Sequence, residues 1–258
     1  MPDNWVKTSL TSQEYGLYEV DGYTVQDGEV TALLDYIPAS ELPEVTENSV
    51  KKVRGDNAVD AKCRLAELLA CPYYIVPHAG EVDVFELGED GLRHHRAFSD
   101  ASEFGQWTMQ IRDRAITKYT RDTSSWSSVE QKLIENDVGA PGDLDSFIYQ
   151  DGDIQSIIEW QTTNKVSPAD HSNNRWFSDD VGRWKPLCTI SEQLDVPLII
   201  IVWSPKPKYP GVRIKRVSNA TFEGHDAGLE YSVDQTMPNA RSNPDTIASV
   251  LSEAVREP

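Results

Sequence analysis

The chain has 258 residues, 39% of them hydrophobic, and 42 Asp and Glu against 24 Lys and Arg give a net charge of −18. No apolar run approaches the roughly 20 residues that span a bilayer, and the start lacks the basic and apolar regions of a signal peptide. We therefore expect a cytoplasmic protein without a membrane partner. The three cysteines are odd in number and widely spaced, which favours buried thiols in a reducing compartment over disulfides or zinc.

The acidic residues are scattered singly and in pairs, a pattern that favours the surface of a protein adapted to high salt (a halophilic protein). A second interpretation is an acidic surface that binds a partner or mimics DNA. A third is a protein with no polyanion partner, because net repulsion opposes binding to phosphates. At multimolar salt the Debye length falls below ~3 Å, so local basic clusters indicate more about nucleic-acid binding than net charge does.

Residues 1–120 are predicted to form an α+β domain. Its predicted elements are strands at 22–25 and 30–36, a helix at 57–70, strands at 73–76 and 82–87, and a helix at 104–119. A polar, Ser/Thr-rich stretch at 120–128 marks the expected domain boundary. We identify no internal repeat in the sequence.

Residues 121–258 are predicted to form a second domain. Its predicted elements are a helix opening with the capping-box sequence Ser127–Glu130, a hairpin at 143–161, a polar loop, a helix that begins near Lys185 or kinks at Pro186, and strands at 197–203 and 212–217. The run from Pro197 to Trp203 is continuously apolar, which is typical of a strand buried on both faces.

The hairpin at 143–161 carries polar side chains where a core strand is expected. Residues two apart on a strand share a face, so Glu159 and Gln161 project together. Ile158 and Trp160 then point to the other face, into a core. A buried carboxylate at such a position needs a partner.

The register of this hairpin decides whether Asp145 meets Glu159. A two-residue loop pairs position 145 with 158 and puts the two carboxylates on opposite faces. A three-residue loop with Gly152 left-handed pairs 145 with 157 and 143 with 159. We predict this three-residue loop, or a bulge. Either brings Asp143, Asp145, Glu159 and Gln161 to one face as a hard-oxygen site suited to Mg²⁺.

The arrangement of Asp145, Glu159 and Gln161 resembles the PD-(D/E)XK motif of the restriction-endonuclease-like superfamily. In that family an Asp precedes Glu-x-Lys on two adjacent strands of an αβββαβ core. The resemblance covers about ninety residues, from 127 to 217, and residues 1–120 match nothing that we recognise. It implies an α/β fold (α+β overall) with an additional N-terminal α+β region.

The resemblance also implies a Mg²⁺-dependent endonuclease acting on DNA, with Asp145, Glu159 and Asp143 as metal ligands and Mn²⁺ as a substitute. RNA stays open as a substrate, and so does a homodimer. Glu130 corresponds to the family's helix acid, although a capping box would turn it back to Ser127. Gln161 replaces the usual Lys. Because Gln orients a water without supplying charge, activity would depend wholly on the metal.

Basic residues that follow the motif are the predicted phosphate contacts. They are Arg175, Lys185, Lys206, Lys208, Arg213, Lys215 and Arg216. An alternative for the run 206–216 is an exposed edge strand protected by Lys and Pro. Two other functions stay open. One is a catalytically inactive member of the same fold that binds nucleic acid or protein, and the other is an acidic interaction protein that mimics DNA.

Overall fold

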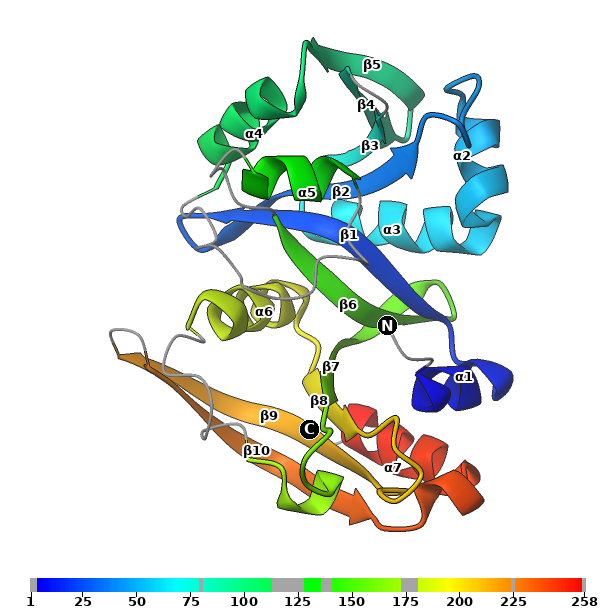
Figure 1. Cartoon of the computed structure of the whole chain (residues 1–258), viewed down its shortest axis with the longest axis vertical. Helices are drawn as coiled ribbons and strands as arrows, with labels where there is room; N and C mark the ends of the chain where they lie inside the picture. The colour runs from blue at the N-terminus through cyan, green and yellow to red at the C-terminus, as the bar shows by residue number, and fades with distance from the viewer. Residues whose placement is uncertain are drawn as a thin grey trace. The chain divides into compact units, whose positions relative to one another are not determined.

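The computed structural model describes residues 4–78, 81–112, 128–135, 141–172, 181–223 and 226–256. These residues form a mixed α/β fold with ten strands and seven α-helices (Figure 1). Internal contacts divide the chain into two compact units, one of residues 1–18 with 145–258 and the other of residues 19–144. The predicted boundary at 120–121 lies outside the described residues. Among the described helices, none is long and apolar enough to cross a membrane.

The unit of residues 19–144 is built on strands in the order β1-β2-β3-β4-β5. Strands β1 and β2 form an antiparallel hairpin, β3 runs parallel to β2, and β4 and β5 continue in antiparallel order. The strands are β1 (Leu17–Gln26), β2 (Glu29–Pro38), β3 (Tyr73–His78), β4 (Val82–Gly88) and β5 (Gly91–Phe98). The helices are α2 (Glu47–Arg54), α3 (Asp56–Leu68), α4 (Ala101–Gln110) and α5 (Ser128–Glu135).

The other unit has its strands in the order β10-β9-β8-β7-β6, with β8 parallel to β7 and the remaining neighbours antiparallel. The strands are β6 (Gly142–Gln150), β7 (Asp153–Thr162), β8 (Leu198–Trp203), β9 (Val212–Glu223) and β10 (Asp226–Met237). The helices are α1 (Trp5–Ser12), α6 (Val181–Leu194) and α7 (Asp245–Arg256), with short 3-10 turns η1 (Pro168–Asp170) and η3 (Ala240–Ser242). Helix α6 begins before Lys185 and continues through Pro186, so the predicted start near Lys185 is wrong.

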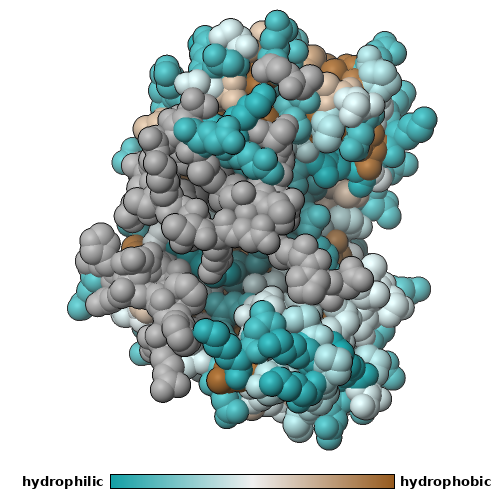
Figure 2. Space-filling model, in the orientation of Figure 1, coloured by the Kyte–Doolittle hydropathy of each residue, from teal (hydrophilic) through white to brown (hydrophobic). Residues whose placement is uncertain are grey.

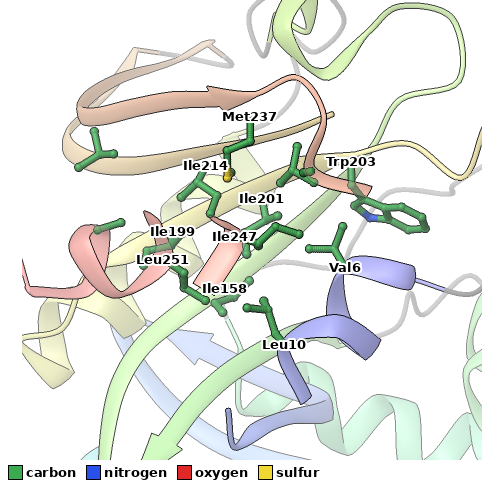
Figure 3. Close-up of a cluster of buried hydrophobic side chains, with 14 of the residues drawn as sticks. Val6, Leu10, Ile158, Ile199, Ile201, Trp203, Ile214, Met237, Ile247 and Leu251 are labelled. Atoms are coloured by element: carbon green, nitrogen blue, oxygen red, sulfur yellow. The ribbon is translucent and has the colours of Figure 1, made fainter. Parts of the chain in front are cut away.

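Helices α1 and α7 cover one face of this unit's strands (Figure 3). Ile158, Ile199, Ile201 and Ile214 are fully buried there against α1 and α7. The helical side of the cluster comes from residues at i, i+4 spacing, namely Val6 with Leu10 and Ile247 with Leu251. Burying each such side chain stabilises the fold by roughly 1.5–3 kcal/mol. All six residues of β8 are buried, as the apolar run predicted.

Helix α6 covers the opposite face. Ile157, Ile200 and Val202 alternate with the residues of the first cluster and are also fully buried. Helix α6 contacts β7, β8, β9 and β10, and it buries Trp184 and Leu187. By strand alternation, Glu159 and Gln161 lie on this α6 face.

The two halves of the chain repeat one order of elements, so the absence of an internal repeat was a wrong prediction. In the described residues, each half has a leading helix, a hairpin, one or two helices, a strand parallel to the second strand of the hairpin, two antiparallel strands and a final helix. Both hairpins turn on Asp-Gly, at Asp27–Gly28 and Asp151–Gly152, with all four residues at positive φ. Both also show a register shift soon after the turn.

The connection into the parallel strand repeats as well. Ala70 and Asp195 both have positive φ and both stand two residues before a proline. The carbonyls of these prolines, Pro72 and Pro197, accept hydrogen bonds from equivalent positions of β2 and β7, each at 3.0 Å. The leading helices are exchanged, because α1 belongs to the unit that holds the second hairpin and α5 to the unit that holds β2–β5.

The described surface on the face in Figure 2 is mostly hydrophilic, with hydrophobic residues visible only in small patches. In the described ranges the large exposed hydrophobic residues are Leu68, Met109 and Val166, on separate elements. This distribution agrees with the excess of acidic residues, which keeps charge spread over the surface.

Candidate active site

The β6–β7 hairpin closes with a two-residue turn, so the predicted three-residue loop is wrong. Asp151 and Gly152 have φ of 53° and 84°, and Gln150 pairs with Asp153. Positive φ at both central residues belongs to the type I′ turn, whose twist matches that of the flanking strands. Asp tolerates this conformation better than most non-glycine residues.

A bulge in β7 then changes the register. Tyr149 pairs with Ile154, but Ile148 pairs with Ser156, so Gln155 is the extra residue. The ladder ends with Ser146 opposite Ile158, and one further step sets position 145 opposite 159. The predicted pairing of 143 with 159 is therefore wrong. The bulge that we named as the alternative is present and brings Asp145 and Glu159 to the same face.

Asp145 joins the two strands beyond the last backbone pair. Its Oδ2 accepts a hydrogen bond from the backbone N–H of Trp160 at 3.0 Å. On the opposite face the Trp160 indole N–H donates to the Ser146 hydroxyl at 2.9 Å. The carboxylate thus takes the place of a strand carbonyl, which fixes its position next to Glu159.

Glu159 is held by a cation from α6. Its side chain is 4% exposed, and its Oε1 forms an ion pair with the Arg183 guanidinium, whose side chain is 26% exposed. Arg183 also lies over the Trp184 ring, 5.4 Å from its centroid. A buried carboxylate without a partner is very costly, and the ion pair offsets that cost. Arg183 is not among the site residues that the sequence predicted, because its contact with Glu159 depends on how α6 packs against β7.

Gln161 supplies the third oxygen on this face. Its side chain is buried, and within the described residues its Oε1 has no hydrogen-bond partner. Buried amide oxygens almost always have a partner, so this atom points to a ligand. The described residues contain no cluster of three His, Cys, Asp or Glu suited to a metal ion. A cation here would therefore combine the carboxylates with an amide oxygen, a donor set that suits Mg²⁺.

The remaining predicted acids are Asp143 and Glu130. Asp143 is exposed, two residues before Asp145 on β6. Glu130 stands in the first turn of α5, in the unit of residues 19–144. Burial first, and then the charge of Glu130, raise the pKa of Tyr36 well above its usual value. The capping partner predicted for Glu130, Ser127, lies outside the described residues.

Two of the exposed predicted phosphate contacts keep a local partner. Lys206 donates to the Asn164 carbonyl at 2.9 Å, and the Lys208 ammonium lies 4.7 Å from the Tyr209 ring centroid. Lys185 is exposed on α6, and Arg175 lies outside the described residues.

The basic residues of β9 are engaged within the fold. Arg213 makes two hydrogen bonds to the Asp234 carboxylate, at 2.5 and 2.6 Å, and Arg216 donates to the Ala254 carbonyl at 2.9 Å. Lys215 is 2% exposed, and burial lowers its pKa to about 8. The edge-strand alternative for 206–216 is wrong for β9, because β10 pairs along it.

The first hairpin carries an acid pair at the same spacing. In the first hairpin, Asp21 lies six residues before the turn residue Asp27, and Asp35 lies eight residues after it. Asp145 and Glu159 have the same spacing from the turn residue Asp151 of the second hairpin. The Asp21 carboxylate accepts a hydrogen bond from the Tyr36 N–H at 2.9 Å, which repeats the contact between Asp145 and Trp160. The spacing around the two Asp-Gly turns is the sequence signal that could have revealed this pair.

Two cations and a tyrosine contact the acid pair of the first hairpin. Asp35 is fully buried and receives hydrogen bonds from the Lys62 ammonium at 2.5 Å and the Tyr73 hydroxyl at 2.7 Å. Arg54 contacts Asp21 and lies 3.6 Å from Asp35. Burial, followed by the charge of Asp35, raises the pKa of Asp21 although both cations oppose the shift. We name these residues (Asp21, Asp35, Arg54, Lys62 and Tyr73) the sealed cluster.

Compared with protein-family models, curated proteins and solved structures, the chain matches none.

Proposed function

We propose that the chain is a Mg²⁺-dependent nuclease that hydrolyses phosphodiester bonds in DNA at Asp145, Glu159 and Gln161. The observation that carries the proposal is the bulged β6–β7 hairpin. It sets two carboxylates on one face beside a buried amide oxygen that has no described partner. The order β6-β7-α6-β8, with β8 parallel to β7, supports the proposal because it matches the last four elements of the family's αβββαβ core. Between α5 and α6 the described residues hold two strands where that core has three.

Each side chain has a defined part in this proposal. Asp145, Glu159 and Gln161 would hold the cation, which when bound lowers the pKa of a water and offsets charge on the phosphate. Asp145 is oriented by the Trp160 N–H and Glu159 by burial beside Ile157 and Ile158. Arg183 is the described cation nearest this chemistry, because it already contacts Glu159. It can supply the positive charge that the family's Lys provides.

DNA is the proposed substrate, and it approaches against net repulsion from a chain of charge −18. The binding surface would use Lys185, Lys206 and Lys208, which are exposed. Arg213, Lys215 and Arg216 serve the fold instead, through their contacts with Asp234, Tyr231 and the end of α7. Binding that depends on a few lysines should weaken steeply as salt rises.

A second candidate is a catalytically inactive protein of the same fold. The ion pair between Arg183 and Glu159 favours it, because a cation already neutralises the central acid. The sealed cluster shows that this scaffold can convert an acid pair into a structural device. Such a protein would bind a partner without cleaving it.

Cleavage assays in parallel at high and moderate KCl distinguish the two candidates. Plasmid DNA, single-stranded DNA and RNA are incubated with the protein and Mg²⁺, Mn²⁺ or EDTA. We expect cation-dependent cleavage by the wild type and by Asp151→Asn, whose substitution is exposed at the turn of the same hairpin. Glu159→Gln should be inactive. Intact substrates in every condition would reject the nuclease and leave the inactive binder.

A further inference from the structure

Arg183 forms an ion pair with Glu159, the carboxylate that the proposed cation would bind. Its guanidinium contacts Oε1 of Glu159, whose side chain is 4% exposed. A cation can bind Glu159 at that oxygen only if the guanidinium moves. Arg183 and a divalent cation therefore compete for the same atom.

Within the sealed cluster, the contact between Lys62 and Asp35 shows what a permanent version of this ion pair looks like. Lys62 is 4% exposed, and its partner Asp35 is fully buried beneath it and Tyr73. Arg183 is 26% exposed and rests on the Trp184 ring at the rim of the helix. Its guanidinium can therefore turn to solvent without unpacking the core, whereas the Lys62 ammonium cannot.

The buried amide of Gln161 indicates that the second site is built for something more than an ion pair. Its Oε1 lies on the same face as Glu159 and finds no partner among the described residues. At the equivalent position, the first hairpin has Ile37, which is fully buried and apolar. The second hairpin therefore has a polar side chain, Gln161, at the position where the first hairpin has an apolar one, Ile37.

We propose that Arg183 is a counter-ion that makes divalent-cation binding conditional on a phosphate-bearing substrate. In the resting protein the guanidinium neutralises Glu159. When Glu159 exchanges Arg183 for the cation, the released guanidinium binds a phosphate group of the nucleic acid, for which its planar, two-donor geometry is suited. Cation and substrate then strengthen each other's binding by the same factor. The inference rests on the proposed function, since it places the cation at Glu159.

Calorimetric titration of Ca²⁺, with and without a short DNA duplex, tests this coupling. Ca²⁺ uses the same kind of oxygen ligands as Mg²⁺ and provides a binding readout that does not require turnover. For the wild type we expect weak Ca²⁺ binding that the duplex strengthens about tenfold, within the usual range of coupling. Arg183→Met should bind Ca²⁺ about tenfold more tightly without DNA, and the duplex should add little.

Two further variants keep the test decisive. Arg64→Met removes a surface cation that pairs with Glu67 on α3, and it should behave as the wild type. Arg183→Lys keeps a positive charge beside the buried Glu159, so the fold should be preserved. It should retain weak Ca²⁺ binding but lose most of the enhancement by DNA, because an ammonium does not bind phosphate through two parallel donors.

The outcomes separate the inference from the proposed function. Equal Ca²⁺ affinity in wild type and Arg183→Met, or full enhancement by DNA in Arg183→Lys, overturns the role of Arg183 and leaves the cation site standing. Absence of Ca²⁺ binding in folded wild type and in both Arg183 variants, with and without DNA, overturns both.

Discussion

The β1–β2 and β6–β7 hairpins place two acids at equivalent points and surround them differently. In both hairpins, the acid of the first strand accepts a hydrogen bond from the backbone N–H of the residue that follows the acid of the second strand. In the first hairpin, Lys62, Arg54 and Tyr73 close over the pair. In the second, Arg183, which is of intermediate exposure, is the cation that contacts Glu159 among the described residues, and the polar Gln161 replaces the apolar Ile37. The same backbone arrangement therefore holds an acid pair in two different surroundings, which are a cluster of two cations and a tyrosine in the first hairpin and an arginine beside an amide oxygen in the second.

The source of the cation also differs. Leu187 of α6 is the equivalent of Lys62 of α3, because each lies the same number of residues before the proline, Pro197 or Pro72, that precedes the parallel strand. Both side chains are buried. The cation of the second hairpin comes instead from Arg183, one helical turn earlier. Moving the charge towards the helix start leaves it nearer to solvent, which is the physical basis for its proposed exchange.

The largest expected effect is on stability, at the sealed cluster. Lys62→Met leaves the Asp35 charge buried with only Arg54 near it, and removing one partner of a buried pair costs about 3–5 kcal/mol. Urea unfolding should show this loss. The matched control, Arg64→Met on the same helix, should change stability by about 0.5 kcal/mol or less. If the two variants are equally stable, the cluster does not hold the first unit together.

The next largest effect is on DNA cleavage, which should depend on the acid pair of the second hairpin and not on that of the first. Glu159→Gln should reduce cation-dependent DNA cleavage by about a hundredfold or more, because it removes the charge of a central ligand while keeping its shape. Asp35→Asn, at the equivalent position of the first hairpin, should leave the cleavage rate of the folded protein unchanged. Rates are measured on plasmid DNA after far-ultraviolet circular dichroism confirms folding. An equal loss of activity in both variants would contradict a site confined to β6–β7.

Substitution of Gln161 tests what its amide does. Gln161→Lys should preserve or raise cleavage if the amide only positions a water, since the cation meets charge that develops on the phosphate. It should lower both cleavage and Ca²⁺ affinity if the amide oxygen is a ligand, because like charges repel. Gln161→Ile, which copies Ile37, should lower cleavage in either case. Unchanged rates in both variants would remove Gln161 from the site.

The remaining effect concerns the pH dependence of stability at Lys215, whose equivalent in the first half is Phe85. Burial lowers the pKa of Lys215 from 10.5 to about 8. Between these values the unfolded chain binds the extra proton, so stability should rise with pH from about 8 to 10.5. A shift of this size corresponds to a gain of about 3 kcal/mol in the free energy of unfolding across that range. Lys215→Met should flatten that rise, and an unchanged slope would show that Lys215 is not the group responsible.

The sequence predicted the elements of the second half better than their pairing. The strand at 197–203 and the strands of the hairpin follow from apolar runs and an Asp-Gly turn, which act locally. The register depended on where a single extra residue, Gln155, was inserted, and strand alternation does not encode that position. The strand β10 and the helix α7 were not predicted at all.

The roles of charged residues were harder to predict, because they depend on partners distant in sequence. Arg213 was predicted to contact phosphate, but its guanidinium binds the Asp234 carboxylate of the neighbouring strand β10. Lys215 was predicted to do the same, but it is buried. The repeat was missed because the two halves share spacing, turn conformation and burial more than residue identity. Asp21 and Asp35 therefore went unnoticed, although their spacing from the turn equals that of Asp145 and Glu159.

The exchanged leading helix has a consequence for how the chain folds. The indole N–H of Trp5 on α1 donates to the Ser204 carbonyl, 199 residues away, and Val6 and Leu10 complete a core whose other members come from 148 onwards. During synthesis α1 must therefore wait until almost the whole chain has emerged. Contacts of such long sequence separation slow folding. A protein that lacks α1 should fold with an incomplete core, because Val6 and Leu10 are then missing from it.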